Sequence, residues 1–273
     1  MPAQRVLALS REGWLRPFAD YRAGDPFALR DFSEKLRLLM ESELGKGEAI
    51  FPQEGRLKWE IRDLLDEAVF CGYRLKIEKQ GPQKRLVLGG ADHESALPYL
   101  VWSAGQREFV PLLLGLYWLM PTVARRGAIS WVVIEELEMG LHPRAIAAML
   151  VAVLDLLWRG YRVCLSTHSP QVLDLVWALR QLRKHGAKAK SVLRLFGAKE
   201  TQPLLDIGRV ALEKTAKVYF FDRKTQTARE ISDLDPGSRR ADEAGWGGLT
   251  EFSGYVADEV ARVVANSGVD DTA

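Results

Sequence analysis

The spacing of apolar side chains predicts helices and a hairpin in the first hundred residues. Apolar residues recur at helical spacing over about 29–44, and a second helix is predicted over about 57–70. Two short strands are predicted at 73–78 and 85–88, and the Gly81-Pro82 pair between them is typical of a hairpin turn. We therefore expect residues 1–100 to form a helical and β-hairpin subdomain.

After residue 100 the pattern changes to helix and strand in alternation. Ser103 followed by Gln106 forms a capping-box arrangement, which predicts a helix start there. The continuous apolar run at 131–134 predicts a strand that is covered on both faces. Pro143 suits the first position of the next helix, and Gly160 suits its end.

A second strand is predicted at 161–165, and a helix is predicted from Pro170 to about His185. Strand, helix and strand with short connections form a βαβ unit, so the two strands should be parallel. Parallel strands end at the same edge of a sheet, where open α/β folds place their ligands. Glu135 and Glu136 follow the first strand and His168 follows the second, so we expect them to face one crevice.

Composition fits a globular protein and excludes few functions. The 273 residues are 47% hydrophobic and 27% charged, with 38 basic and 36 acidic side chains. This balance gives no argument for nucleic acid or an anionic membrane. Cys71 and Cys164 are the only cysteines, so we do not expect a disulfide framework, and we expect a reducing compartment. Without an apolar stretch long enough to cross a membrane or a signal pattern, we expect a soluble cytoplasmic protein.

Three motifs occur in a fixed order: SAGQRE at 103–108, WVVIEELE at 131–138 continuing to LHP at 141–143, and LSTHSP at 165–170. They resemble the signature motif, the Walker B motif with its catalytic acid, and the switch histidine of ATP-binding-cassette-class ATPases. More narrowly, they resemble the soluble overcoming-lysogenization-defect-like (AAA_21-type) AAA ATPases, many of them linked to phage defence. The resemblance implies an α/β, P-loop NTPase-like fold with a partial parallel sheet flanked by helices, preceded by the α+β subdomain.

The resemblance also implies a role for each motif residue, with ATP and Mg²⁺ as cofactors. Glu135 would support Mg²⁺ through water, Glu136 would orient and deprotonate the attacking water, and His168 would contact the γ-phosphate. A helix start carries unpaired N–H groups and partial positive charge. In the family such a start caps the nucleotide of the opposite subunit, which implies a homodimer or another head-to-head pairing of two heads. The residues concerned here are Ser103, Gly105 and Gln106.

The phosphate-gripping loop of such ATPases, Gly-x-x-x-x-Gly-Lys-[Ser/Thr], is absent from the sequence. Gly45-Lys46 is the only Gly-Lys pair, and Met40 stands where the first glycine would be. The segment PAQR at 2–5 resembles one that follows the missing lobe in the family. We therefore expect the chain to be the C-terminal part of a longer ATPase. A loop supplied by a partner chain and a pseudo-ATPase remain alternatives.

The expected organisation is a subdomain at 1–100, an ATPase lobe at 101–265 and a tail at 266–273. The leading function is a nucleotide-driven dimer switch acting on an effector protein; the rivals are a non-catalytic dimerisation or regulatory module and a metal-dependent hydrolase using Glu135, Glu136 and His168. His142 is interpreted as a helix-start residue. A basic cluster is interpreted as a solvated helix end, with DNA contact as the alternative: Arg180, Arg183, Lys184, His185, Lys188 and Lys190.

Overall fold

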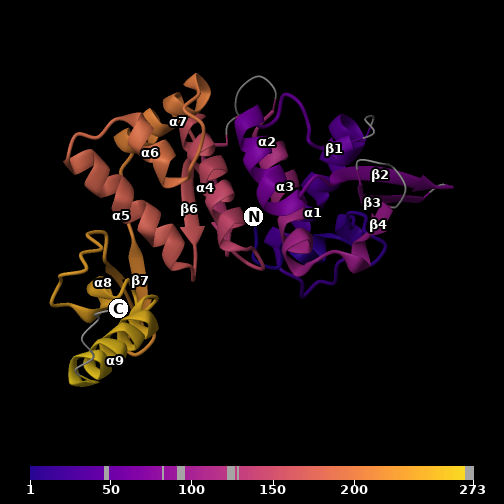
Figure 1. The fold of residues 1–273 in the computed structure, drawn as a ribbon. Coiled ribbons are helices and arrows are strands. Elements are labelled where there is room, and N and C mark those ends of the chain that lie inside the picture. The colour runs from indigo at the N-terminus through magenta and orange to yellow at the C-terminus, as the bar shows by residue number, and fades with distance from the viewer. Residues whose placement is uncertain (46–48, 82, 91–95, 122–126, 128, 268–273) are drawn as a thin grey trace. The chain divides into compact units, whose positions relative to one another are not determined.

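The computed structural model describes residues 1–45, 49–81, 83–90, 96–121, 127 and 129–267 (Figure 1). The chain forms two compact units, each built from two stretches of sequence. Unit 1 contains Met1–Thr167 and Gly186–Lys214, and unit 2 contains His168–His185 and Thr215–Ala273. No described helix is both long enough and apolar enough to cross a membrane.

The N-terminal part of unit 1 combines two helices with a small antiparallel sheet (Figure 1). Helices α1 (Phe27–Leu39) and α2 (Trp59–Leu65) each continue into a π-helical turn, at Met40–Leu44 and Asp66–Phe70. The sheet order is β1 (Ala49–Phe51), β2 (Arg74–Gln80), β3 (Gln83–Gly89) and β4 (Ala96–Pro98). The expected β2–β3 hairpin is confirmed, although Pro82 in its turn lies outside the described residues.

The rest of unit 1 contains the βαβ unit, which consists of β5 (Trp131–Glu135), α4 (Pro143–Trp158) and β6 (Arg162–Ser166). It also contains the helices α3 (Ala104–Leu119), α6 (Ala189–Leu195) and α7 (Gln202–Glu213). Strands β5 and β6 are parallel, with Trp131 opposite Arg162 and Glu135 opposite Ser166. The predicted parallel pairing is therefore confirmed, and both strands end at the same edge. Helix α4 packs against β6, α2 and α7, and most of its length is buried.

The expectation that the 131–134 strand is covered on both faces is wrong. Val132 and Ile134 are buried, whereas Trp131 is 59% exposed and Val133 is 50% exposed. Cys164 on β6 is exposed as well. A continuous apolar run does not tell whether its second face finds a covering layer within the same 273 residues. The β5–β6 sheet thus presents an apolar face that the described residues of unit 1 leave accessible.

Unit 2 is built around α5 (Pro170–Lys184), which ends just before Gly186 as predicted. Its other elements are β7 (Tyr219–Asp222), β8 (Thr227–Glu230), α8 (Ala241–Ala244) and α9 (Glu251–Ser267). Strands β7 and β8 form an antiparallel hairpin. The core gathers Leu173, Ile231, Leu234 and Trp246. Asn266 of the expected tail belongs to α9, and residues 268–273 lie outside the described residues.

Candidate functional site

Two acids stand where β5 ends and the chain turns away from the sheet. Glu135 is the last residue of β5, and Glu136 follows it with a φ of 46°. A residue with a Cβ pays about 1–2 kcal/mol for this left-handed conformation, so the surrounding contacts must impose it. One such contact is the Glu136 N–H, which donates to the carbonyl oxygen of Ser166 at the end of β6 (3.0 Å). Both parallel strands therefore fix the position of Glu136, β5 by preceding it in the chain and β6 through this hydrogen bond.

The carboxylate of Glu135 is oriented by the first residues of the chain. The Ala3 N–H donates to Glu135 Oε2 (2.9 Å). The Glu135 N–H donates to the Met1 carbonyl oxygen (3.0 Å), and the Met1 nitrogen donates to the Val133 carbonyl oxygen (2.6 Å). Since β6 pairs with the opposite edge of β5, the end of β5 is held from both sides.

A buried arginine fixes the backbone of the same turn. Arg5 is fully buried, and its guanidinium donates to the carbonyl oxygens of Glu135 (Nη1, 2.8 Å) and Glu136 (Nη2, 2.9 Å). Its Nε donates to the Glu108 carbonyl oxygen on α3 (3.1 Å) and lies 3.6 Å from the Glu108 carboxylate. Burial lowers the pKa of Arg5 and raises the pKa of Glu108. Arg5 thus joins α3 to the end of β5, a role that the sequence pattern does not indicate.

The start of α3 has the predicted capping box. The Gln106 N–H donates to Ser103 Oγ (3.2 Å), and the Ser103 N–H donates to Gln106 Oε1 (3.0 Å). Gly105 lies against the loop that follows β5, where a Cβ on Gly105 would stand 2.7 Å from the Gly140 carbonyl oxygen. Only glycine allows this close approach of the two backbones.

The three predicted residues of this helix start line one hollow of about 350 Å³. Its walls come from the start of α3, the loop between β5 and α4, the first turn of α4 and the π-helical turn after α2. The lining residues are Ala68, Val69, Ser103, Ala104, Gly105, Gln106, Gly140, Leu141, His142 and Ala145. Glu135 and Glu136 are not among the lining residues. The structure therefore brings Ser103, Gly105 and Gln106 together in a hollow that neither acid lines.

The loops that follow β5 and β6 are joined by a side-chain hydrogen bond. Thr167 Oγ1 donates to Glu138 Oε1 (2.8 Å). Thr167 is the last residue of this stretch of unit 1, and His168 is the first residue of unit 2. The structure thus fixes the residue before His168 against the loop that carries the acids. The expected approach of His168 to Glu136 stays a prediction.

His142 and Glu135 bear on the metal hypotheses. His142 precedes α4, and its Nδ1 accepts from the Arg144 N–H (3.2 Å), which confirms the helix-start role. In the part of the chain that the structure describes, no three His, Cys, Asp or Glu side chains gather closely enough to hold a metal. Mg²⁺ commonly uses one or two carboxylates together with waters and phosphate oxygens. Glu135, a single carboxylate held at a strand end, suits that mode of binding.

Comparison with known proteins identifies the family. A family model described as AAA domain, putative AbiEii toxin, Type IV TA system, matches residues 20–174, more than half of the chain. The chain belongs to this AAA family. No curated protein and no solved structure matches the chain. Membership gives the chain an AAA-type, P-loop ATPase-like domain, for which ATP is the nucleotide and Mg²⁺ the usual metal.

Proposed function

We propose that this AAA-family chain is the C-terminal portion of an ATP-hydrolysing head of the ATP-binding-cassette class. In this portion Glu136 orients the attacking water and takes its proton, Glu135 supports Mg²⁺, and His168 contacts the γ-phosphate. The helix start at Ser103, Gly105 and Gln106 caps the nucleotide of a second head. Nucleotide-driven pairing of two heads, reversed by hydrolysis, then acts on an effector protein.

The observation that carries the proposal is the left-handed turn at Glu136. A glutamate in this conformation, directly after a strand, is costly and is imposed by a fully buried arginine and by Ser166. Such strain is typical of functional positions, because the surrounding structure must stabilise a geometry that the residue would not adopt alone. A positioned general base contributes about 10²–10⁴-fold in rate, which gives a functional reason for a strained backbone at Glu136.

Two further observations support this proposal. One favours the pairing of two heads, and the other favours an additional layer of protein that covers the β5–β6 sheet. The α3 hollow does not include Glu135 or Glu136, as expected if each belongs to a different nucleotide site. The accessible apolar face at Trp131 and Val133 is unusual for a parallel sheet, which is normally covered on both faces. We propose that this face receives the layer that carries the phosphate-gripping loop.

The binding test uses the purified chain. Calorimetric titration with Mg²⁺ and ATP should show weak or undetectable binding, because residues 1–273 contain no Gly-x-x-x-x-Gly-Lys-[Ser/Thr] loop to cradle the β-phosphate. Tight binding would show that these residues already contain a phosphate cradle, and would overturn the incomplete-site part of the proposal.

The catalytic test uses the assembly that the tagged chain forms in its native cell, purified with Mg²⁺ and ATP. Glu136→Gln should reduce turnover by about 10²–10⁴-fold while nucleotide binding is retained. Glu213→Gln, an exposed carboxylate on α7, is the matched control and should leave turnover unchanged. Full turnover in Glu136→Gln would refute the catalytic assignment. No hydrolysis in the wild-type assembly would favour a non-catalytic dimerisation or regulatory module.

A further inference from the structure

Within unit 2, helix α9 presents an exposed apolar side. Every residue from Glu251 to Asn266 is exposed, including Phe252 at 79% and Val260 at 57%. The described residues of unit 2 pack their core elsewhere, around Leu173 and Trp246. A helix of this length is marginally stable in water without a packed face, so α9 needs an occupant for its apolar side.

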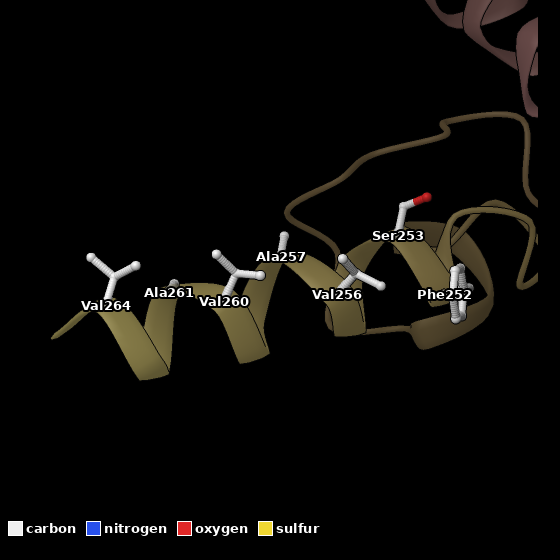
Figure 2. Close-up of a pocket in the computed structure, with 7 residues that line it drawn as sticks. All are labelled: Phe252, Ser253, Val256, Ala257, Val260, Ala261 and Val264. Carbon is white, nitrogen blue, oxygen red and sulfur yellow. The ribbon is translucent and has the colours of Figure 1, made fainter. Parts of the chain in front are cut away.

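The apolar side consists of two adjacent rows, seen side-on in Figure 2. One row has large side chains at every fourth position: Phe252, Val256, Val260 and Val264. The neighbouring row has small ones: Ser253, Ala257 and Ala261. Together the seven residues line an open hollow of about 620 Å³. A large-residue row is a ridge and a small-residue row is a groove, so α9 carries both halves of a helix-packing contact.

We propose that α9 pairs with α9 of a second copy of this chain. A two-fold interface uses the same patch twice, so the patch must be complementary to itself. The Phe252–Val264 ridge of one copy can lie in the Ser253–Ala261 groove of the other, and the reverse contact follows by symmetry. Interdigitated rows of this four-residue spacing cross at about −50°.

The accessible area is sufficient for such a pair. Covering the ridge and groove of both copies removes on the order of 1,000 Å² from water, the lower bound for a specific interface. The α9 interface is therefore expected to be a modest one, and its strength depends on the centre of the face, at Ala257 and Val260.

The charges on α9 favour a second copy over a membrane surface. Its charged residues are Glu251, Asp258, Glu259 and Arg262, and Arg262 is paired with Glu259 on the same helix (2.6 Å). Helices that lie on anionic membranes are rich in Lys and Arg on their polar side. The acidic excess of α9 would instead be repelled by anionic lipid.

The test is the mass of the whole chain in solution, measured by sedimentation velocity over a concentration series without nucleotide. Wild type should approach twice its 30.7 kDa mass as concentration rises. Val260→Glu places a charge at the centre of the face and should weaken association by at least tenfold. Arg262→Gln, on the polar side of the same helix, is the control and should associate like wild type. At a dilution at which wild type is monomeric, circular dichroism should show equal helix content in all three.

Ala257→Leu separates a fitted pair from general stickiness. Leu makes the face more apolar and is nearly as good a helix former as Ala. It also fills the groove, so the paired state should weaken. Stronger association of Ala257→Leu, or a monomeric wild type throughout the series, would overturn the α9 pair. So would binding of wild type to phosphatidylserine vesicles without self-association. A dimer that forms only with Mg²⁺ and ATP and survives Val260→Glu would also overturn it, while leaving the proposed ATPase function standing.

Discussion

Removal of the Arg5 guanidinium should strongly destabilise unit 1. Arg5→Met keeps an unbranched side chain of similar length, but it deletes all the hydrogen-bond donors. The carbonyl oxygens of Glu108, Glu135 and Glu136 then lose a donor in the protein interior, and the Glu108 carboxylate loses its nearby positive charge.

The size of the effect follows from these four contacts. Removing one partner of a buried charged contact costs about 3–5 kcal/mol, and each buried polar group left without a partner costs about 1–3 kcal/mol. These contributions overlap because they share one side chain, so we expect a total loss of about 3–5 kcal/mol. That is a large share of the roughly 5–15 kcal/mol that stabilises a typical domain. Arg5→Lys keeps the charge but cannot reach three carbonyl oxygens at once, and should fall between wild type and Arg5→Met.

The assay combines urea denaturation with hydrogen exchange followed by mass spectrometry. Besides losing stability, Arg5→Met should lose amide protection in two separate regions, the start of α3 and the end of β5. Arg16→Met is the control, because the Arg16 side chain is partly exposed and bonds only locally. Its guanidinium donates to the carbonyl oxygens of Leu7 and Asp20 and lies 4.0 Å from the centre of the Tyr21 ring. If Arg5→Met lies within about 1 kcal/mol of wild type, or changes exchange only near residues 1–10, Arg5 does not hold the turn at Glu136.

Three other predictions concern the same region. Gly105→Ala should lower the unfolding free energy by about 1–3 kcal/mol, because the added Cβ meets the Gly140 carbonyl oxygen. Gly24→Ala is the control, since a Cβ there meets nothing within 4 Å and should leave the unfolding free energy unchanged. Thermal denaturation of both variants measures the difference. Glu136→Gly should be at least as stable as wild type in urea, because glycine adopts a positive φ without strain; a clear loss would contradict that strain. Burial raises the pKa of Glu108 above its ordinary value of 4.5. Wild type should therefore lose stability relative to Glu108→Gln as the pH rises from about 4.5 through the folded-state pKa. A difference in unfolding free energy between the two proteins that does not change with pH would contradict this.

Features set by neighbouring residues could be predicted from the sequence. The capping box needs only Ser103 and Gln106, three positions apart, and it formed as expected. Pro143 and Gly160 likewise mark the two ends of α4. The parallel pairing of β5 and β6 followed from the short connections on either side of that helix. In each case the physical cause lies within one element or one connection.

Features set by distant residues could not be predicted. β1 and β4 have three residues each, too few for a strand pattern. The exposure of Trp131 depends on what covers the sheet, and an apolar run looks the same in both cases. Arg5 contacts groups 103 to 131 residues away, and a single arginine in a sequence segment without a periodic pattern gives no sign of such partners.

The candidate site was predictable in part for the same reason. Placing Glu135 and Glu136 at a strand end required only the length of the apolar run and the rule for parallel sheets. The left-handed φ of Glu136 could not be predicted from the sequence, because contacts with Arg5 and Ser166, which are distant in the chain, impose it. His168 follows β6 as expected, and its meeting with Glu136 stays a prediction.

That meeting can be measured directly with a pair of engineered thiols. In a background of Cys71→Ser and Cys164→Ser, the chain would carry Glu136→Cys with His168→Cys and be treated with a short bifunctional maleimide. Glu136→Cys with Glu213→Cys is the control pair, and should give no intramolecular cross-link. We predict an efficient cross-link within one chain for the first pair, detected by peptide mass spectrometry. No cross-link, when both thiols react fully with a monofunctional maleimide, would contradict a shared phosphate site at the two strand ends.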